Sequence, residues 1–225
     1  MDISKLPEKL NEAILSENYE HLKKIDKTKL LKENFLGAVG CIPVIGSWVT
    51  GLAGSIMNYC DSALFRKIFV FIYELKDTTK KERLKFVKEV EETAEDVAGN
   101  VLCEMINRMD NINKAIFTAN LVKARINDDI SIEDFFRLSA VCERIPYSDF
   151  RYLKQFEDEA MIDGGVTEIL YASGALIQRT IGDDENKYTL SIIGRKLLKF
   201  GLSSDVNLEV KNVTFIPSME FGEID

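Results

Sequence analysis

The chain has 225 residues, 46% of them hydrophobic and 29% charged, and its formal net charge at pH 7 is −8. This composition is that of a folded globular protein and excludes an intrinsically disordered chain. The negative net charge argues against a general binder of nucleic acid or of anionic lipid, because both attract a positive protein field.

Residues 1–33 are polar and of mixed charge, and their apolar positions have helical spacing. These positions are Leu10, Ile14, Leu22, Ile25 and Leu30. We expect one or two short helices here. The opening run MDISKLPEKLNEAIL has no basic region followed by an apolar one. We therefore expect no secretory signal, and a cytoplasmic chain or one associated with the inner membrane from its cytoplasmic side.

Asn34–Cys60 is a stretch of 27 residues without a charged side chain. Its length would let a helix cross the hydrocarbon core, which takes about 20 apolar residues. Small residues recur at every fourth position, which allows close helix packing in lipid, and a tryptophan could mark an interface. Pro43 and five glycines dilute the hydrophobicity, so burial against the rest of the protein is the alternative. The candidate membrane or helix-packing residues are Gly46, Trp48, Thr50, Gly51 and Gly54.

The segment from Ser62 to residue 127 has the spacing of three or four amphipathic helices joined by short polar turns. Thr79 and Glu82 form a capping-box signature, and Asp110 is expected to cap a later helix. The expected inward positions are Leu64, Phe65, Ile68, Phe69, Ile72 and Leu75, then Leu84, Val87 and Val90, then Val97, Val101, Met105 and Met109. With the apolar segment, residues 34–127 are predicted to form a helical bundle.

Residues 128–203 read as a winged helix, which makes the predicted fold mainly α with one small β-hairpin. Ser131 begins a helix that Pro146 stops, Ser148 begins a second, and Thr167 caps a third, EILYASGALI. The runs LIQRTI and KYTLSI predict a hairpin, and Ile192–Phe200 a closing helix that ends at a C-capping Gly201. Residues 204–225 form a C-terminal tail.

The third helix of this block carries no Lys or Arg, although it is the helix that usually enters the DNA major groove. Residues 151–187 contain four basic and eight acidic side chains, and this excess of acid should repel a duplex. A protein partner is therefore favoured over nucleic acid. The candidate interaction residues are Tyr171, Gln178, Arg179, Lys187, Arg195, Lys196 and Lys199.

The run EILYASGALIQRT…KYTLSIIGRKLLKFG resembles the ending of many winged-helix domains. The longer stretch from IPVIGSW through ELKDTTKKERLKFV to ISIEDFFRLSAV is similar to uncharacterised bacterial and phage-associated helical proteins of the abortive-infection alpha and domain-of-unknown-function 4393 type. The resemblance covers residues 35–200 and carries structural motifs only. It implies a bacterial accessory protein in phage defence or exclusion.

Nothing in the sequence points to catalysis, a metal or a cofactor. Cys41, Cys60, Cys103 and Cys142 contain no CxxC pair, so we expect buried free thiols in a reducing compartment. His21 has no Cys or His companion at metal-ligand spacing. Phosphate-binding, dinucleotide-binding and nucleophile-elbow motifs are missing. We predict a protein that is not an enzyme.

The sequence thus predicts a non-catalytic accessory or effector that combines a membrane-prone segment with a protein-binding winged helix. Two alternatives stay open: a winged-helix transcriptional regulator or nucleic-acid adaptor, and a soluble oligomeric scaffold. The partner's identity and the oligomeric state are left open by the sequence, and a homo-oligomer is compatible with each of these functions.

Overall fold

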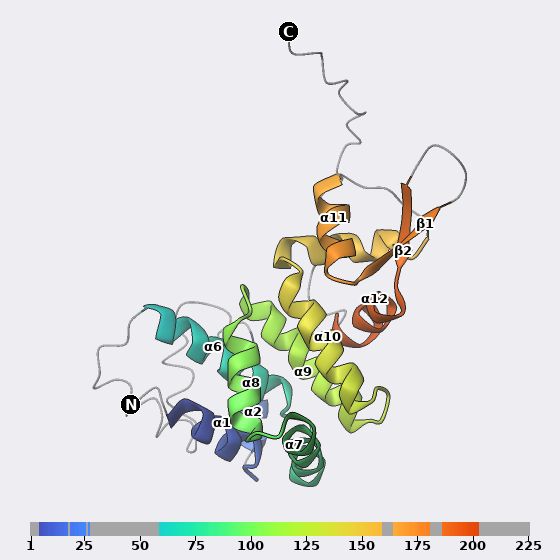
Figure 1. Cartoon of the computed structure of the whole chain (residues 1–225). Coiled ribbons are helices and arrows are strands. Elements are labelled where there is room, and N and C mark those ends of the chain that lie inside the picture. Colours follow the sequence, from blue (N-terminus) through green and yellow to red (C-terminus); the bar gives the residue numbers. More distant parts are fainter. Residues whose placement is uncertain are drawn as a thin grey trace.

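Figure 1 shows the computed structural model of the chain, which describes residues 5–17, 19–25, 27, 59–158, 164–180 and 186–202. The protein is mainly helical, with one antiparallel sheet of two strands in this described part. The candidate residues of the apolar segment, Gly46, Trp48, Thr50, Gly51 and Gly54, lie outside the described residues. So do the hairpin turn at 183–185 and the tail 204–225.

In the described part of the chain, seven helices come first: the short N-terminal helices, the helices of the predicted bundle, and the helix that follows the bundle. They are α1 (Leu6–Ile14), α2 (Glu20–Lys23), α6 (Tyr59–Glu74), α7 (Lys80–Ala94), α8 (Ala98–Asn107), α9 (Ile112–Ile126) and α10 (Ile132–Arg144). The following elements are a 3₁₀ helix η2 (Tyr147–Phe156), α11 (Gly164–Ala172), β1 (Leu176–Thr180), β2 (Asn186–Leu190), α12 (Ile192–Lys196) and a π-helical turn η3 (Leu197–Gly201). We call the elements from α10 to η3 the C-terminal block.

Helix α9 lies at the centre of the bundle. Its residues 114–122 are buried without interruption, as expected of a helix covered on all sides. It packs against α6, α7, α8, α10 and η3. One hydrophobic core runs from Leu6 in α1 to Leu197 in η3, so the N-terminal helices and the C-terminal block share it.

Of the helix starts predicted at Thr79, Ser131 and Asp110, the first two are confirmed. Thr79 Oγ1 accepts a hydrogen bond from Glu82 N at 3.3 Å, and Glu82 Oε2 accepts one from Thr79 N at 2.7 Å, which completes the capping box. Ser131 Oγ accepts from Asp134 N at 3.1 Å. The third prediction was wrong: α9 is capped by Asn111, whose Oδ1 accepts from Asn113 N at 2.9 Å. Asp110 is engaged elsewhere, by Lys114 and by the amide of Tyr147.

The inward face of α7 differs from the predicted one. Leu84 is 38% exposed, whereas Phe86, Val87 and Val90 are buried together with Arg83. Val87 and Val90 thus face inward as predicted, whereas the charged residue Arg83 is buried in place of Leu84. In α8 the predicted Val97 is likewise 48% exposed; the buried positions are Leu102, Cys103, Met105 and Ile106.

Arg83 is buried because it joins α7 to the end of α1. Its Nε donates to Ile14 O and its Nη2 to Ser16 O, both at 2.6 Å. Its Nη1 donates to the carbonyl and the hydroxyl of Thr78. The guanidinium lies 3.7 Å from the ring centroid of Tyr19. A cation therefore caps the carbonyls at the negative end of the α1 dipole, where positive charge is stabilised.

The C-terminal block carries α11 and the hairpin at one end of the molecule, while α1, α2 and α7 lie at the other end (Figure 1). Leu176 pairs with Leu190 and Gln178 with Tyr188 on one sheet face. The rings of Tyr188 and of Tyr171 in α11 meet at 5.5 Å between centroids, so this face is turned towards α11.

The structure of the C-terminal block differs from the sequence-based prediction in three details. Helix α11 begins at Gly164, so Thr167 is a buried residue inside its first turns and not its cap. The segment after Pro146 forms a 3₁₀ helix. Gly201 is not a left-handed cap, since Gly174 is the one glycine with positive φ, +90°, in the described part of the chain. A Cβ at Gly201 would lie 2.9 Å from Leu197 Cδ1, the end of a flexible side chain that would have to shift.

Candidate interaction surface

Exposed large apolar side chains gather in the C-terminal block. Six such side chains occur among the described residues, and four of them lie there: Ile169, Tyr171, Ile177 and Ile192. Ile192, at the start of α12, is 76% exposed. Scattered apolar side chains are normal on a protein surface, but their concentration in one block marks that block as the candidate site.

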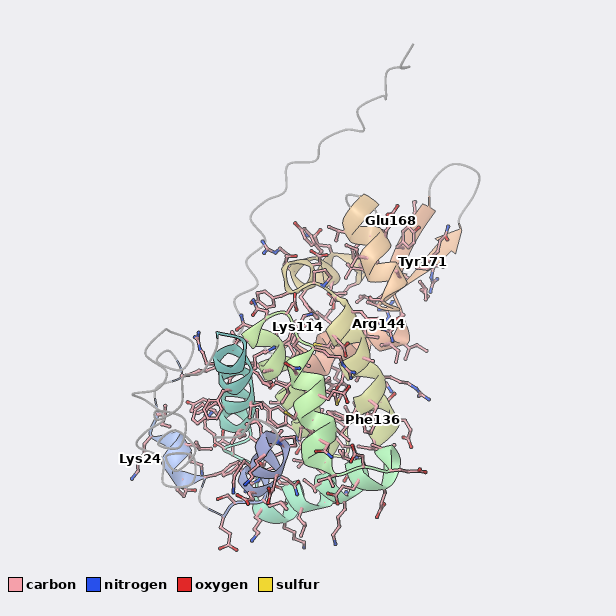
Figure 2. All side chains as sticks on the ribbon, turned by 60° about the vertical axis from the view of Figure 1, so that its left-hand side comes forward. Lys24, Lys114, Phe136, Arg144, Glu168 and Tyr171 are labelled. Carbon is pink, nitrogen blue, oxygen red and sulfur yellow. The ribbon has the colours of Figure 1, made fainter. Side chains whose placement is uncertain are left out.

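Helix α11 has a clear division between its inner and outer faces. Thr167 and Leu170 are buried, whereas Glu168, Ile169 and Tyr171 are exposed. Figure 2 shows Glu168 and Tyr171 on this helix, at the end of the molecule far from Lys24. The contact with Tyr188 holds the Tyr171 ring, which is 47% exposed. The outer face is therefore apolar and acidic, with no cation.

The opposite face of the hairpin carries two cations. Arg179 and Lys187 are directly opposed in the register, and Ile177 lies on the same face two residues before Arg179. Like charges at opposed positions destabilise a strand pair. Neither cation has an ion pair with another described residue.

A groove of about 510 Å³ opens beside the hairpin, between η2 and the closing helix. It is lined by Lys154, Glu157, Leu190, Arg195, Leu198 and Lys199. Arg195 Nη2 lies 3.4 Å from Thr189 Oγ1, and Lys199 Nζ lies 4.7 Å from the ring centroid of Phe200. Arg195 and Lys199 are thus brought together in a groove to which α11 contributes no lining residue.

Two predicted interaction residues remain, Lys196 and Gln178. Lys196 forms a short ion pair with Asp134, which ties α12 to the first turn of α10. Gln178 lies on the sheet face that is turned towards α11. The seven predicted residues therefore divide into Tyr171 on α11, a hairpin pair, a groove pair, Lys196 in an ion pair within the fold, and the exposed Gln178.

Sequence reasoning missed Lys154, Leu198, Ile169, Ile177 and Ile192. Alternation along β1 would have placed Ile177 opposite Leu176, on the outer face of the strand. Lys154 comes close to the closing helix only through tertiary packing, and no local pattern predicts that approach.

The thiol prediction is confirmed where it can be followed. Cys103 and Cys142 are buried and free, and burial raises the pKa of Cys103 and raises that of Cys142 to about 12. Cys41, the side chain of Cys60 and the side chain of His21 lie outside the described residues. Within the residues that the structure places, no three His, Cys, Asp or Glu side chains are grouped as metal ligands.

No helix in the described ranges is both long enough and apolar enough to span a bilayer. No protein-family model matches the chain, and neither a curated protein nor a solved structure was found to be similar to it. The geometry of the C-terminal block therefore carries the functional argument.

Proposed function

We propose that this protein is an adaptor whose C-terminal block belongs to a winged-helix domain, residues 128–203, that binds a protein partner through α11. The order of elements supports the fold assignment, since α10, η2, α11, the hairpin and α12 follow one another as in a winged helix. Helix α11 packs on η2 and on β1, which gives it the place of the third helix in such domains.

The outer face of α11 is the observation that carries the choice of partner. It presents Glu168, Ile169 and Tyr171, and its residues 164–172 include no Lys or Arg. Phosphate contacts supply most of the affinity for DNA and require cations. Protein interfaces, by contrast, are enriched in aromatic side chains that anchor in a pocket of the partner. Tyr171 is such an anchor, because Tyr188 already orders its ring.

The proposal is tested by placing a photo-crosslinking amino acid at position 171 in the full chain, in cells. We expect one discrete protein adduct, which a second change, Ile169→Glu, abolishes because it puts a charge into the same face. The matched control places the crosslinker at Lys81, an exposed position on α7, and should not give this adduct. An adduct that survives Ile169→Glu, or that also forms from position 81, would contradict a specific interface on α11.

A nucleic-acid adaptor is the second candidate, and Arg179, Lys187, Arg195 and Lys199 are the residues that favour it. Such a protein would bind duplex DNA with an affinity that falls steeply with salt, and would lose binding when Arg195 and Lys199 become Ala. Lys196 belongs to this basic group in sequence, but its ion pair with Asp134 gives it a structural role.

The phage-defence role that the resemblance implies, and the membrane association of Asn34–Cys60, stay predictions. Apart from the helical backbone of Tyr59 and Cys60, that segment lies outside the described residues.

A further inference from the structure

We propose that the groove between η2 and the closing helix binds an acidic segment of a partner protein, with Arg195 and Lys199 as the residues that receive its carboxylates. The inference goes beyond the proposed function, because it uses none of the α11 residues. It names the chemistry of a partner: an extended peptide with two acidic side chains two residues apart and an apolar side chain beside them.

The charge of the groove is opposite to that of the chain as a whole. Lys154, Arg195 and Lys199 line it with one carboxylate, Glu157, in a protein of net charge −8. None of the three cations forms an ion pair with another described residue. Lys196, next to Arg195, is paired with Asp134. Three cations without an ion pair among the described residues, grouped around one groove, provide electrostatic complementarity for an acidic ligand.

Two leucines line the groove together with the charged side chains. Leu190 is 2% exposed, and Leu198 is half-buried. The volume of about 510 Å³ lies within the range of about 300–1,000 Å³ that is usual for ligand pockets. Protein interfaces likewise combine buried apolar side chains with polar ones. It suits a peptide that has both apolar and acidic side chains.

The spacing of the two cations selects an extended peptide. Arg195 lies in α12 and Lys199 in the π-helical turn η3. The two are four residues apart, which is at most about 6 Å along the axis at the α-helical rise of 1.5 Å per residue. Alternate side chains of an extended chain are separated by roughly 6.6 Å. An acidic–x–acidic sequence therefore places one carboxylate against each cation. Glu157 and the leucines make the groove a poor fit for the continuous phosphates of a duplex.

The test uses the full chain and a fluorescein-labelled peptide of sequence SGLEAELGS, followed by fluorescence anisotropy at low salt. We expect a Kd on the order of 10 µM, typical of a short peptide. R195E/K199E should weaken binding at least 10-fold. The matched control, K81E/K88E, changes two exposed lysines of α7 and should leave binding unchanged. R195Q/K199Q provides a second variant, and thermal melts establish that each variant is folded.

A charge-reversed peptide, SGLKAKLGS, tests whether the charges of Arg195 and Lys199 determine which peptide binds. It should bind R195E/K199E and not the unaltered chain. Absence of binding of the acidic peptide at 1 mM (about 100 times the expected Kd), or binding indifferent to R195E/K199E, would overturn the proposal. So would a 20-base-pair duplex that binds through Arg195 and Lys199 more tightly than the peptide does (about two helical turns of DNA).

A further experiment tests whether an acidic segment of this same chain occupies the groove. Residues 203–225 carry Asp205, Glu209, Glu220, Glu223 and Asp225 and lie outside the described residues. If the peptide binds only after these five are changed to Asn or Gln, a segment of the same chain takes the groove and the partner proposal fails. Binding of the peptide by the unaltered chain supports the partner proposal.

Tyr171→Ala should not change the affinity for the peptide. The groove proposal and the α11 proposal are therefore tested separately.

Discussion

At the scale of single residues, the bundle contains buried cations that are held by hydrogen bonds, ion pairs and aromatic rings. Lys114 is 1% exposed. Its Nζ lies 2.5 Å from Asp110 Oδ1 and donates to Glu143 O at 3.1 Å. It also lies 5.7 Å from the ring centroid of Phe150. A buried charge is tolerated only with such partners, and these come from α10, from η2 and from the turn before α9.

Asp110 connects this cluster to the pH dependence of stability. Burial acts to raise the pKa of its carboxyl, but the hydrogen bonds from Lys114 and from the amide of Tyr147 outweigh it, and the pKa is lowered from 3.8. A group whose pKa is lower in the folded state contributes stability above its unfolded pKa. That contribution is lost as the pH falls through the folded value.

We therefore expect Asp110→Asn to destabilise the protein at pH 7 by about 1 kcal/mol, since the carboxylate is half-exposed and partly screened. Below about pH 4, the usual carboxyl range, the difference from the unaltered chain should shrink as that carboxyl is protonated. Urea unfolding between pH 2.5 and pH 7 measures it. A difference that stays constant down to the lowest pH would mean that Asp110 acts through geometry and not through its charge.

The helix caps could be predicted from the sequence and the buried cations could not, for a physical reason. Helix caps are local, so the side-chain oxygens of Thr79 and Ser131 could be assigned from spacing alone. Arg83 and Lys114 are read as surface residues, because cations are almost never fully buried unless paired. Their partners, Ile14 and Glu143, supply carbonyl oxygens from distant helices, and no local pattern reports them.

At the scale of elements, glycines set how closely α1 and α8 approach. A Cβ built on Gly99 would lie 2.1 Å from the carbonyl oxygen of Pro7, so the first turns of α8 lie directly against the backbone of α1. Gly164, at the start of α11, has no atom within 4 Å of its Cβ position. Replacing glycine by alanine therefore adds a methyl group to a crowded site at Gly99 and to open space at Gly164.

Gly99→Ala should lower the free energy of unfolding by about 1–3 kcal/mol, because backbone must move to admit the methyl group. Gly164→Ala should leave it unchanged or raise it by up to about 1 kcal/mol, since alanine favours the helix. Thermal and urea denaturation of the two variants measure both effects. If the two variants were equally stable, the close approach of α1 and α8 would be refuted.

The order of elements could be read from the sequence better than their orientation. The sequence of helices, the hairpin and the acidic outer face of α11 follow from periodicity and composition. The rotation of α7 could not be predicted, because Arg83 takes a core position. The groove could not be predicted either, since Lys154 and Lys199 are 45 residues apart and meet only when η2 packs beside the closing helix.

At the scale of the whole molecule, α9 connects the bundle to the C-terminal block. On one side it packs against α6, and on another against η3. The side chain of Asn120, 8% exposed, donates from Nδ2 to Gly201 O at 3.0 Å. This hydrogen bond holds the last helical turn to the central helix, within the single core that runs from α1 to η3.

A shared core predicts that both parts unfold together. Asn120→Ala leaves the Gly201 carbonyl buried without this donor, at a cost of about 1–3 kcal/mol. In native-state hydrogen exchange, the slowest amides of α6 and of α12 should lose protection by the same amount, because both exchange through global unfolding. Asn100→Ala, on an exposed position of α8, is the control and should change stability by less than about 0.5 kcal/mol.

Loss of protection confined to α12 and η3 would instead show that the C-terminal block opens on its own. In that case a partner bound at α11 or at the groove would have no route to the bundle through α9.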